Sequence, residues 1–502
     1  MYFYILLTYM EYRITIHVKV DLPILGVEDI HMNKQGVNPY LPPWEYIPDG
    51  EPHVFRDRVY VYGSHDRFNG HAFCLNDYVC YSAPANNLAD WRYEGVIYKK
   101  TDDPLNPDGR MCLYAPDVTV GPDGRYYLYY VLDKVSVVSV AVCDSPAGKY
   151  EFYGYVRYSD GTRLGERVDD QPQFDPAVLT EGDLTYLYTG FCAIGDKSRH
   201  GAMATVIGAD MLTIVEEPVF VAPSEPYSKG TSFEEHAFFE APSIRKQGDT
   251  YYFVYSSIVM HELCYATSKH PTSGFEYRGV IVSNNDMHID HYKPANKPTA
   301  YGHNNHGGMV NANGQWYIFY HRHTNGTTFS RQGCIEPITI LEDGTIPQAE
   351  ITTSGPNGGP LIGRGEYPAY LACNLFTDTD QAYTGTYGAW MDGRFPKITQ
   401  DGKDGDEEIG YIANMQNSAT AGFKYFQCDG VQQVKIKVRG YAQGSFEVKT
   451  SWDGPSHGSI PVDFTNVWTT YTADIVIPDG VQSLYFTYAG KGSASLASFT
   501  LV

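Results

Sequence analysis

The chain has 502 residues, enough for two or three domains, and its apolar content of 43% is typical of a globular protein. A formal net charge of −22 argues against nucleic acid and anionic membranes as partners, because both would repel an acidic surface. It is compatible with a neutral ligand such as a sugar. The 43 tyrosines and the many short segments bounded by glycine and proline favour an all-β protein.

The first 37 residues are predicted to be an extension ahead of the folded domains. The apolar run at the very start lacks a basic beginning and is interrupted by Glu11, so it makes a poor signal peptide. Met32 opens a stretch that reads like a natural protein start, and residues 1–31 are therefore interpreted as an upstream extension from start-site choice. A real extra strand is the alternative. No stretch of the sequence reaches the length of a transmembrane helix.

The nine cysteines are scattered along the chain and form no CxxC pair, which argues against a zinc cluster. Their odd number and scatter are typical of reduced cysteines, hence of a reducing compartment. Together with the weak signal features, they predict a cytoplasmic protein.

A repeated segment marks five copies of one structural unit. The copies are the runs RDRVYVYGS, DGRYYLYYV, GDLTYLYTG, GDTYYFVYSS and NGQWYIFYHR, each a turn signal followed by a β-rich run. Their marker tyrosines, 67, 59, 66 and 65 residues apart, are Tyr60, Tyr127, Tyr186, Tyr252 and Tyr317. Each copy is long enough for a four-stranded sheet, so the spacing predicts a five-bladed β-propeller over residues 38–352.

One polar residue precedes each marker tyrosine at nearly the same distance, 11, 10, 11, 12 and 11 residues earlier. These residues are Asp49, Asp117, Asp175, Glu240 and His306. In a propeller the first strand of every blade lines the central channel, so the five positions should converge at one end of it. Burying several carboxylates together costs free energy through desolvation and like-charge repulsion, which favours a functional role. The alternative is that the acids only cap turns where the blades begin.

The ordered motifs PDGEPHVF, YAPDVTV, QFDPAVL and FFEAPSI resemble those of glycoside hydrolase family 43, over about residues 38–350. The resemblance implies that Asp49 is the general base, that Glu240 is the general acid, and that Asp175 modulates the acid. Inversion requires that a water fit between an acid and a base roughly 6.5–9.5 Å apart, and carboxylates from blades one and four, facing each other across the channel, suit that gap. Asp49 would deprotonate the water and Glu240 would protonate the departing oxygen, with Asp175 raising the pKa of Glu240.

The first motif departs from the family pattern. Gly50 stands where a proline is commoner, and Glu51 is a nearby rival for the role of base. His65 and Asp66 follow the first marker strand and are candidates for the pocket rim. The loop DRFNGHAFCLNDY that begins at Asp66 is expected to close the pocket and to favour attack on terminal sugars.

Three further residues are candidates for substrate binding. Asp117 is expected either to bind sugar hydroxyls or to brace its strand. The resemblance implies that His306 lies in the channel, in contact with the sugar or, through water, with a structural calcium; a satisfied core histidine is the alternative, and His303 is the competing residue. The resemblance also implies that Arg331 reaches the pocket, and the alternative is a surface ion pair with Glu336. No other cofactor is expected.

The C-terminal part is predicted to be a second domain. The Gly- and Pro-rich residues 353–368 are interpreted as a linker, and the short alternating segments of residues 369–502 fit an antiparallel β-sandwich. This part resembles a carbohydrate-binding module of family 6, with Trp390, Trp452 and Tyr485 as candidate sugar-binding rings. The preferred alternative is a structural domain packed on the propeller, with its aromatic rings in the core, because no clear aromatic pair is visible.

The resulting hypothesis is an inverting exo-glycoside hydrolase that releases terminal α-L-arabinofuranosyl or β-D-xylosyl residues from hemicellulose oligosaccharides. One rival is a glycoside phosphorylase, which would need several basic residues to hold phosphate in place of a base. The other rival is a non-catalytic carbohydrate-binding propeller, for which binding alone would not require the three acids.

Overall fold

The computed structural model describes residues 34–377 and 395–502, which form almost only β-strands. The short 3₁₀ helices of these ranges are η1 (Lys100–Asp102), η2 (Glu225–Tyr227), η3 (Gly355–Asn357) and η4 (Ala369–Leu371). The expectations for the first 33 residues and for Trp390 lie outside the described residues. In the described ranges no helix is long and apolar enough to cross a membrane.

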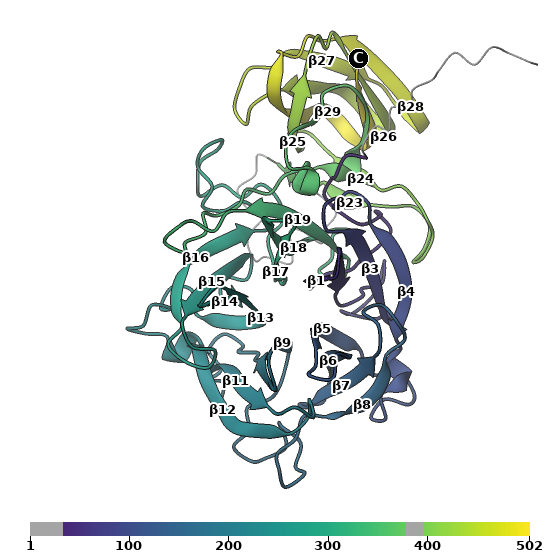
Figure 1. The fold of residues 1–502 in the computed structure, drawn as a ribbon. Coiled ribbons are helices and arrows are strands. Elements are labelled where there is room, and N and C mark those ends of the chain that lie inside the picture. The colour runs from purple at the N-terminus through teal and green to yellow at the C-terminus, as the bar shows by residue number, and fades with distance from the viewer. Residues whose placement is uncertain (1–33, 378–394) are drawn as a thin grey trace, which may run out of the picture. The chain divides into compact units, whose positions relative to one another are not determined.

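Five antiparallel sheets surround a central channel as the blades of a propeller (Figure 1). Blade 1 comprises β1 (Glu51–Phe55), β2 (Arg58–Tyr62), β3 (Tyr78–Pro84) and β4 (Arg92–Tyr98). Blade 2 comprises β5 (Leu113–Val120), β6 (Tyr126–Leu132), β7 (Val138–Cys143) and β8 (Glu151–Tyr155). Blade 3 comprises β9 (Ala177–Glu181), β10 (Leu184–Thr189), β11 (Gly201–Ile207) and β12 (Ile214–Pro223).

Blades 4 and 5 complete the ring. Blade 4 comprises β13 (Phe238–Gln247), β14 (Thr250–Ser257), β15 (Glu262–Ser268) and β16 (Glu276–Ser283), and blade 5 comprises β17 (Met309–Ala312), β18 (Gln315–His323) and β19 (Arg331–Ile338). Each marker tyrosine lies in the second strand of its blade, so the predicted propeller is confirmed. The ring closes where Asn38 exchanges hydrogen bonds with Ile335 of β19, the Ile335 amide donating to Asn38 Oδ1 and Asn38 Nδ2 donating to the Ile335 carbonyl, both at 2.9 Å.

Tyrosine rings fill much of the space between neighbouring blades, which explains why the residue is so abundant. Tyr62, Tyr129 and Tyr255 are fully buried. Their hydroxyls donate to the carbonyls of Pro146, Met211 and His236 at 2.7, 2.7 and 2.6 Å, respectively. A tyrosine can therefore bury a large apolar ring between two sheets while its polar end still finds a partner.

The C-terminal domain is a curled antiparallel sandwich, as predicted, but its boundaries differ from the prediction. Its strands are β20 (Leu361–Ile362), β21 (Gly365–Pro368), β22 (Asn374–Phe376), β23 (Lys397–Thr399), β24 (Tyr411–Met415), β25 (Thr420–Cys428), β26 (Gln433–Lys449), β27 (Gly458–Val462), β28 (Thr465–Asp474) and β29 (Gly480–Leu501). The predicted linker therefore contains β20, which pairs with β25, and β21, which pairs with β29. Two of the strands, β26 and β29, are longer than the short segments expected from the sequence, because glycines such as Gly440, with φ of 137°, let the chain bend without a break.

A buried lysine joins this domain to the propeller. Lys424 of β25 is fully buried, and its Nζ lies 3.0 Å from Asp286 Oδ2 and 2.6 Å from Glu350 Oε1. Nearby, Trp452 stacks on Phe376 with ring centroids 4.3 Å apart, and Tyr485 is 1% exposed. Tyr485 packs inside the protein and Trp452 is half-buried against Phe376, which favours the structural alternative over a sugar-binding surface at these positions.

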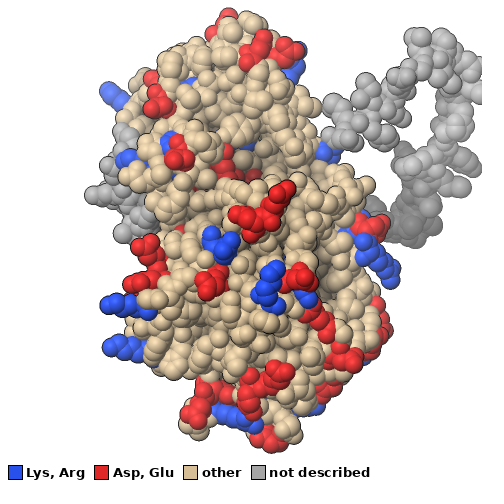
Figure 2. Space-filling view, turned by 60° about the vertical axis from the view of Figure 1, so that its left-hand side comes forward, with Lys and Arg blue, Asp and Glu red and all other residues tan. Residues whose placement is uncertain are grey.

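All nine cysteines are free, as expected for reduced thiols. On the face shown in Figure 2, acidic and basic side chains are scattered rather than gathered into one charged patch.

We expect Lys424→Ala to lower the free energy of unfolding by about 3–5 kcal/mol, because two largely buried carboxylates lose their cation. Chemical unfolding followed by fluorescence measures this. Lys449→Ala is the matched control, since its ammonium lies on the surface 3.8 Å from Glu447, and it should cost at most about 1 kcal/mol. Equal stability of the two variants would show that the buried cation does not join the domains.

Candidate active site

A pocket opens to solvent at one end of the channel, with about 620 Å³ of space between its walls. Residues from every blade or its connecting loops line it: Asp49, Phe73, Tyr114, Phe174, Asp175, Phe191, Phe239, Glu240, Met260, His303, Asn304, His306 and Arg331. Four of the five polar residues that the repeat placed in register are among them. The expected convergence of blade entrances is therefore present, with one exception.

Local bends in the backbone turn the three pocket carboxylates into the channel. Asp49 and Asp175 lie two residues before the first strands of their blades, with positive φ angles of 57° and 45°. Asp adopts this left-handed conformation more readily than most residues. In blade 4 the bend follows the acid, since Ala241 has φ of 65° and the pairing of β13 with β14 shifts register on either side of Glu240. Backbone strain of this kind is concentrated at functional sites.

Asp117 is the exception, and its assignment to substrate binding is not retained. It is fully buried outside the pocket lining, and it accepts hydrogen bonds from the amides of Val118 and Val178 at 2.7 and 2.8 Å. A register shift in β5 between Tyr114 and Asp117 places the tyrosine, not the acid, against the pocket. The contacts of Asp117 support the alternative that it braces the strands of blades 2 and 3.

Glu51, the rival for the role of base, also lies below the pocket. Its Oε2 accepts hydrogen bonds from Ser243 at 3.0 Å and from Arg245 at 2.8 Å. Glu51 is not part of the pocket lining, whereas Asp49 is. The geometry therefore favours Asp49 over Glu51.

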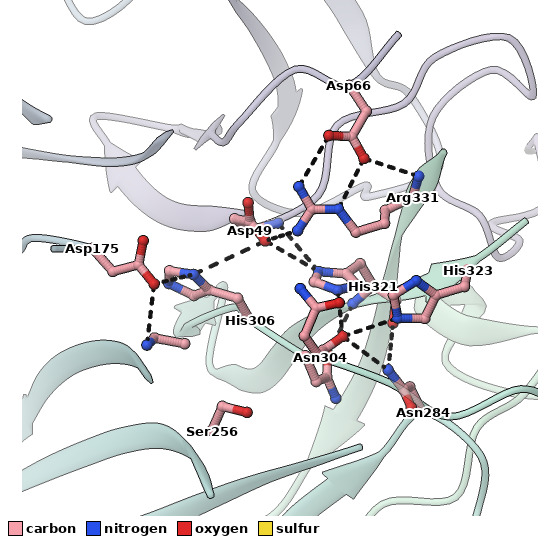
Figure 3. Close-up of polar contacts among 12 residues, drawn as sticks. Asp49, Asp66, Asp175, Ser256, Asn284, Asn304, His306, His321, His323 and Arg331 are labelled. Atoms are coloured by element: carbon pink, nitrogen blue, oxygen red, sulfur yellow. Dashed lines mark hydrogen bonds and ion pairs between the residues drawn. The ribbon is translucent and has the colours of Figure 1, made fainter. Parts of the chain in front are cut away.

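Arg331 is the cation of the pocket (Figure 3). It donates from Nε and Nη2 to the two carboxylate oxygens of Asp66 at 2.8 and 3.0 Å, and from Nη1 to Asp49 Oδ1 at 2.8 Å. The expected alternative of a surface pair with Glu336 is wrong, because Arg331 is buried and Glu336 instead accepts hydrogen bonds from Tyr320 and Thr352. Asp66, predicted only as a rim candidate, is the residue that orients the guanidinium.

The pocket histidines are neutral at pH 7. Burial lowers the pKa of His306 to about 4, and its Nδ1 lies 3.7 Å from Asp175 Oδ2 and 4.0 Å from Asp49 Oδ1. His303, its competitor, also lines the pocket. His65 is not part of the lining and lies 2.9 Å from the Asp77 carbonyl.

Sequence reasoning missed a polar layer behind Asp49, formed by His321, His323 and Asn304. His321 Nε2 lies 2.7 Å from the Asn304 carbonyl, so it carries the proton, and Nδ1 is free to accept from the Asp49 amide at 3.4 Å. His323 Nε2 lies 3.0 Å from the same carbonyl (Figure 3). The signal was available in the segment YHRH, because residues two apart on a strand face the same side.

Glu240 holds its proton at neutral pH. Burial raises its pKa to about 8, the negative charge of Asp49 adds to this, and Arg331 opposes it. The pKa of Asp175 is also raised well above its usual value, first by burial and then by repulsion from Glu240. The predicted repulsion between Glu240 and Asp175 is present in the raised pKa of Asp175, and burial and the charge of Asp49 add to the effect on Glu240.

An arc of aromatic rings forms the apolar wall of the pocket. Tyr114, Phe174, Phe191 and Phe239 follow one another with centroid separations of 5.2, 5.4 and 5.4 Å. Phe73 lies against the Arg331 guanidinium at 4.8 Å from the ring centroid. Phe73 comes from the loop that was expected to close the pocket, so that loop does contribute to its wall.

The C-terminal domain holds this loop in place. Asp404 accepts hydrogen bonds from the amide of Phe68 at 2.7 Å and from Asn76 Nδ2 at 3.1 Å. Asn325 donates to Asn69 at 2.6 Å, and its own Oδ1 accepts from Thr399 at 2.8 Å. The loop that carries Asp66 and Phe73 is thus fixed from outside the propeller.

The residues around His306 offer few oxygen ligands for the expected calcium. Glu51 Oε1 is buried, accepts no hydrogen bond from the described residues, and lies 3.9 Å from His306 Nε2. One such oxygen and one imidazole are few ligands for an ion that takes six to eight oxygens. Arg245, 2.8 Å from the other oxygen of Glu51, already supplies positive charge. Calcium in the channel therefore stays a prediction, and no chemical step depends on it.

Comparison with known proteins gives one consistent result. The protein family "Glycosyl hydrolases family 43" matches residues 51–346 of this chain. A xylosidase/arabinosidase of Thermoclostridium stercorarium is 76% identical over 470 residues, covering 94% of this chain and 99% of that protein. A xylosidase/arabinosidase of Bacteroides ovatus is 28% identical over 316 residues, covering 56% of this chain and 87% of that protein.

Among solved structures, a family 43 β-xylosidase/α-arabinofuranosidase from a compost metagenome aligns with a TM-score of 0.50 at 27% identity. The alignment covers 63% of this chain and 98% of that chain, which was solved with xylotriose in a calcium-free form.

We expect the Glu240 carboxyl to lose its proton with a midpoint near pH 8, protonated below and ionised above. Carboxyl-labelled NMR, with Glu240→Gln to assign the signal, measures it. Asp49→Asn should move the midpoint down, because it removes a neighbouring negative charge. Glu276→Gln, at an exposed position of blade 4, is the control and should leave it unchanged. A midpoint at the ordinary value of 4.5 would contradict the effect of burial.

Proposed function

Because the chain belongs to glycosyl hydrolases family 43, we propose that it is an inverting exo-glycosidase that releases terminal α-L-arabinofuranosyl or β-D-xylosyl residues from hemicellulose oligosaccharides. The observation that carries the proposal is the meeting of Asp49, Asp175 and Glu240 in one aromatic-walled pocket. The names of its relatives, xylosidase/arabinosidase, support this substrate class.

In the proposed reaction Asp49 and Glu240 act on opposite sides of the scissile bond. The Asp49 carboxylate, held by Arg331 at 2.8 Å, takes a proton from a water molecule as that water attacks the anomeric carbon. The bond from the anomeric carbon to the glycosidic oxygen breaks, and Glu240 gives its proton to that oxygen. Attack from the face opposite to the leaving group inverts the anomeric configuration.

Asp175 acts as a positioning residue for the acid. Its Oδ2 accepts a hydrogen bond from the Ala241 amide at 3.3 Å, directly after Glu240. It thereby fixes the bend of β13 that turns Glu240 into the pocket. The proximity of two buried carboxyls also favours a proton on at least one of them.

The shape of the pocket supports action on terminal sugars. Ring faces of Tyr114, Phe174, Phe191 and Phe239 are suited to the apolar faces of a sugar, while polar groups at the channel end suit its hydroxyls. Phe73 adds to the wall from the loop above. Such a pocket fits the end of a chain better than its middle.

The two rival functions are less consistent with the site. Arg331 is the only lysine or arginine in the lining of this pocket as described, and Asp49 and Asp66 already pair with it, so phosphate would find no free cation. A binding protein would gain nothing from a buried acid whose pKa is raised to about 8. The free cysteines are consistent with our further proposal of a cytoplasmic enzyme that acts on imported oligosaccharides.

The direct test is a screen with nitrophenyl α-L-arabinofuranoside and nitrophenyl β-D-xyloside. We expect hydrolysis of at least one, with the free sugar appearing first as the inverted anomer in time-resolved proton NMR. Addition of phosphate should yield no sugar phosphate. Sugar binding without turnover of either substrate would favour the non-catalytic propeller, and retention of configuration would refute the assignment of Asp49 as base.

The loss of rate on replacing the acid should depend on the leaving group of the substrate. Glu240→Gln keeps the shape but removes the proton, so hydrolysis of natural xylosyl or arabinosyl links should fall by about 10²–10⁴-fold. A dinitrophenyl glycoside, whose leaving group needs no proton, should keep much of its rate. Asp49→Asn should depress both reactions, because the water is left unactivated in either case. Equal damage by Glu240→Gln to both substrate types would show that Glu240 is not the acid.

A further inference from the structure

Three side chains with metal-binding atoms converge in blade 4, outside the pocket (Figure 1 shows the blade as β13–β16). They are His236, which precedes β13, and Glu262 and Cys264 of β15; their ligand atoms all lie within 4.8 Å of one another. His236 Nδ1 lies 2.6 Å from Glu262 Oε1, and Cys264 Sγ lies 3.4 Å from the same oxygen and 3.9 Å from His236 Nδ1.

The second oxygen of Glu262 has no hydrogen-bond partner among the described residues. Glu262 is fully buried, and an unsatisfied buried carboxylate oxygen is costly. His288 Nε2 lies 3.9 Å from this oxygen. This distance is too long for a hydrogen bond but is close to the separation of two ligands on one ion.

We propose that His236, Glu262, Cys264 and His288 form a binding site for one transition-metal ion of the zinc class. Two imidazoles, one carboxylate and one thiolate are the donors that such an ion prefers, whereas calcium and magnesium prefer oxygen alone. Bond lengths of about 2.0–2.3 Å place tetrahedral ligands about 3.3–3.6 Å apart. The separations of Cys264 Sγ from Glu262 Oε1 and from His236 Nδ1, 3.4 and 3.9 Å, fit with small adjustments. His288 faces the other oxygen of Glu262 and lies outside the group of three, so its exposed side chain must move inward to complete the ligand set.

For an ion to bind, the 2.6 Å hydrogen bond between His236 Nδ1 and Glu262 Oε1 must break. A proton now lies between these two atoms, and a cation in its place would attract both. The bound ion replaces that proton and the thiol proton of Cys264, and both are released to solvent. The side chains of His236 and His288 are 22% and 52% exposed, so the ion has a path to the buried ligands.

The other comparable group in the described part of the chain lacks these features. It consists of Glu51, His53 and Asp117 in the channel. Arg245 already donates to Glu51 at 2.8 Å and lies 3.5 Å from His53 Nε2, so a guanidinium occupies the place of a cation. Among the described residues no lysine or arginine pairs with the blade 4 cluster in this way, and the imidazole of His288 can serve as a ligand.

The site would reinforce the backbone next to the acid without taking part in hydrolysis. His236 lies four residues before Glu240 on the segment that enters β13, and Met260, two residues before Glu262, lines the pocket. A metal bound here would tie this segment to the β14–β15 turn and to the loop that carries His288.

Zinc titration of the metal-free full-length protein, with metal content after dialysis, tests the proposal. We expect one zinc per chain and a rise in melting temperature on binding. His288→Ala should weaken binding by at least about 10–100-fold, the range seen even for residues that only support a ligand. His270→Ala, an exposed histidine of the same blade, is the control and should bind like the wild type.

Cobalt substitution tests the thiolate independently. The wild-type protein should show thiolate-to-cobalt charge-transfer absorption, which Cys264→Ser should abolish and Cys334→Ser, at a buried cysteine of blade 5, should leave intact. If Cys264→Ser does not fold, His288→Ala decides, because that side chain is half exposed. Failure of the wild type to bind zinc, or zinc binding unchanged by His288→Ala, would overturn the proposal, whatever the outcome of the glycoside assays.

Discussion

The pocket depends on one buried cation. Asp49, Asp66 and Asp175 are buried, and the half-buried acid Glu240 lines the same pocket as Asp49 and Asp175. Such a cluster of carboxyls would be strongly destabilising without a counter-charge. Arg331 supplies it by binding two carboxylates at once. Arg331 begins the last strand of blade 5, whereas Asp49 precedes β1 and Asp66 follows β2 of blade 1. The interaction that neutralises the site therefore also links the first blade to the last.

The other groups around Arg331 add no further positive charge to the pocket. The nearby histidines are neutral because burial lowers their pKa values, so they add hydrogen bonds but no second positive charge. The aromatic arc excludes water on the opposite side, which raises the pKa of Glu240 through desolvation. The same burial therefore affects the two acids differently. The Asp49 carboxylate pairs with the guanidinium of Arg331, whereas Glu240 keeps its proton.

The periodic features of the sequence predicted the fold well, and the local irregularities limited the prediction of the site. Marker tyrosines report strand pairing, so they located all five blades. Asp117 was misplaced because a register shift in β5 cannot be seen in spacing alone. The linker was misjudged because glycine and proline also occur in short strands such as β20 and β21. Cys264 offered no metal signal, since its neighbours in space come from separate turns of blade 4.

Through Asp404, the C-terminal domain supports the pocket although it is distant from the pocket residues in sequence. By holding Phe68 and Asn76, it fixes the loop on which Phe73 faces the ligand site and Asp66 faces Arg331. The dimensions of the pocket mouth are thus a joint property of two domains. Substitutions in the C-terminal domain, none of whose described residues lines the pocket, are therefore a route by which natural drift or laboratory evolution can retune substrate preference.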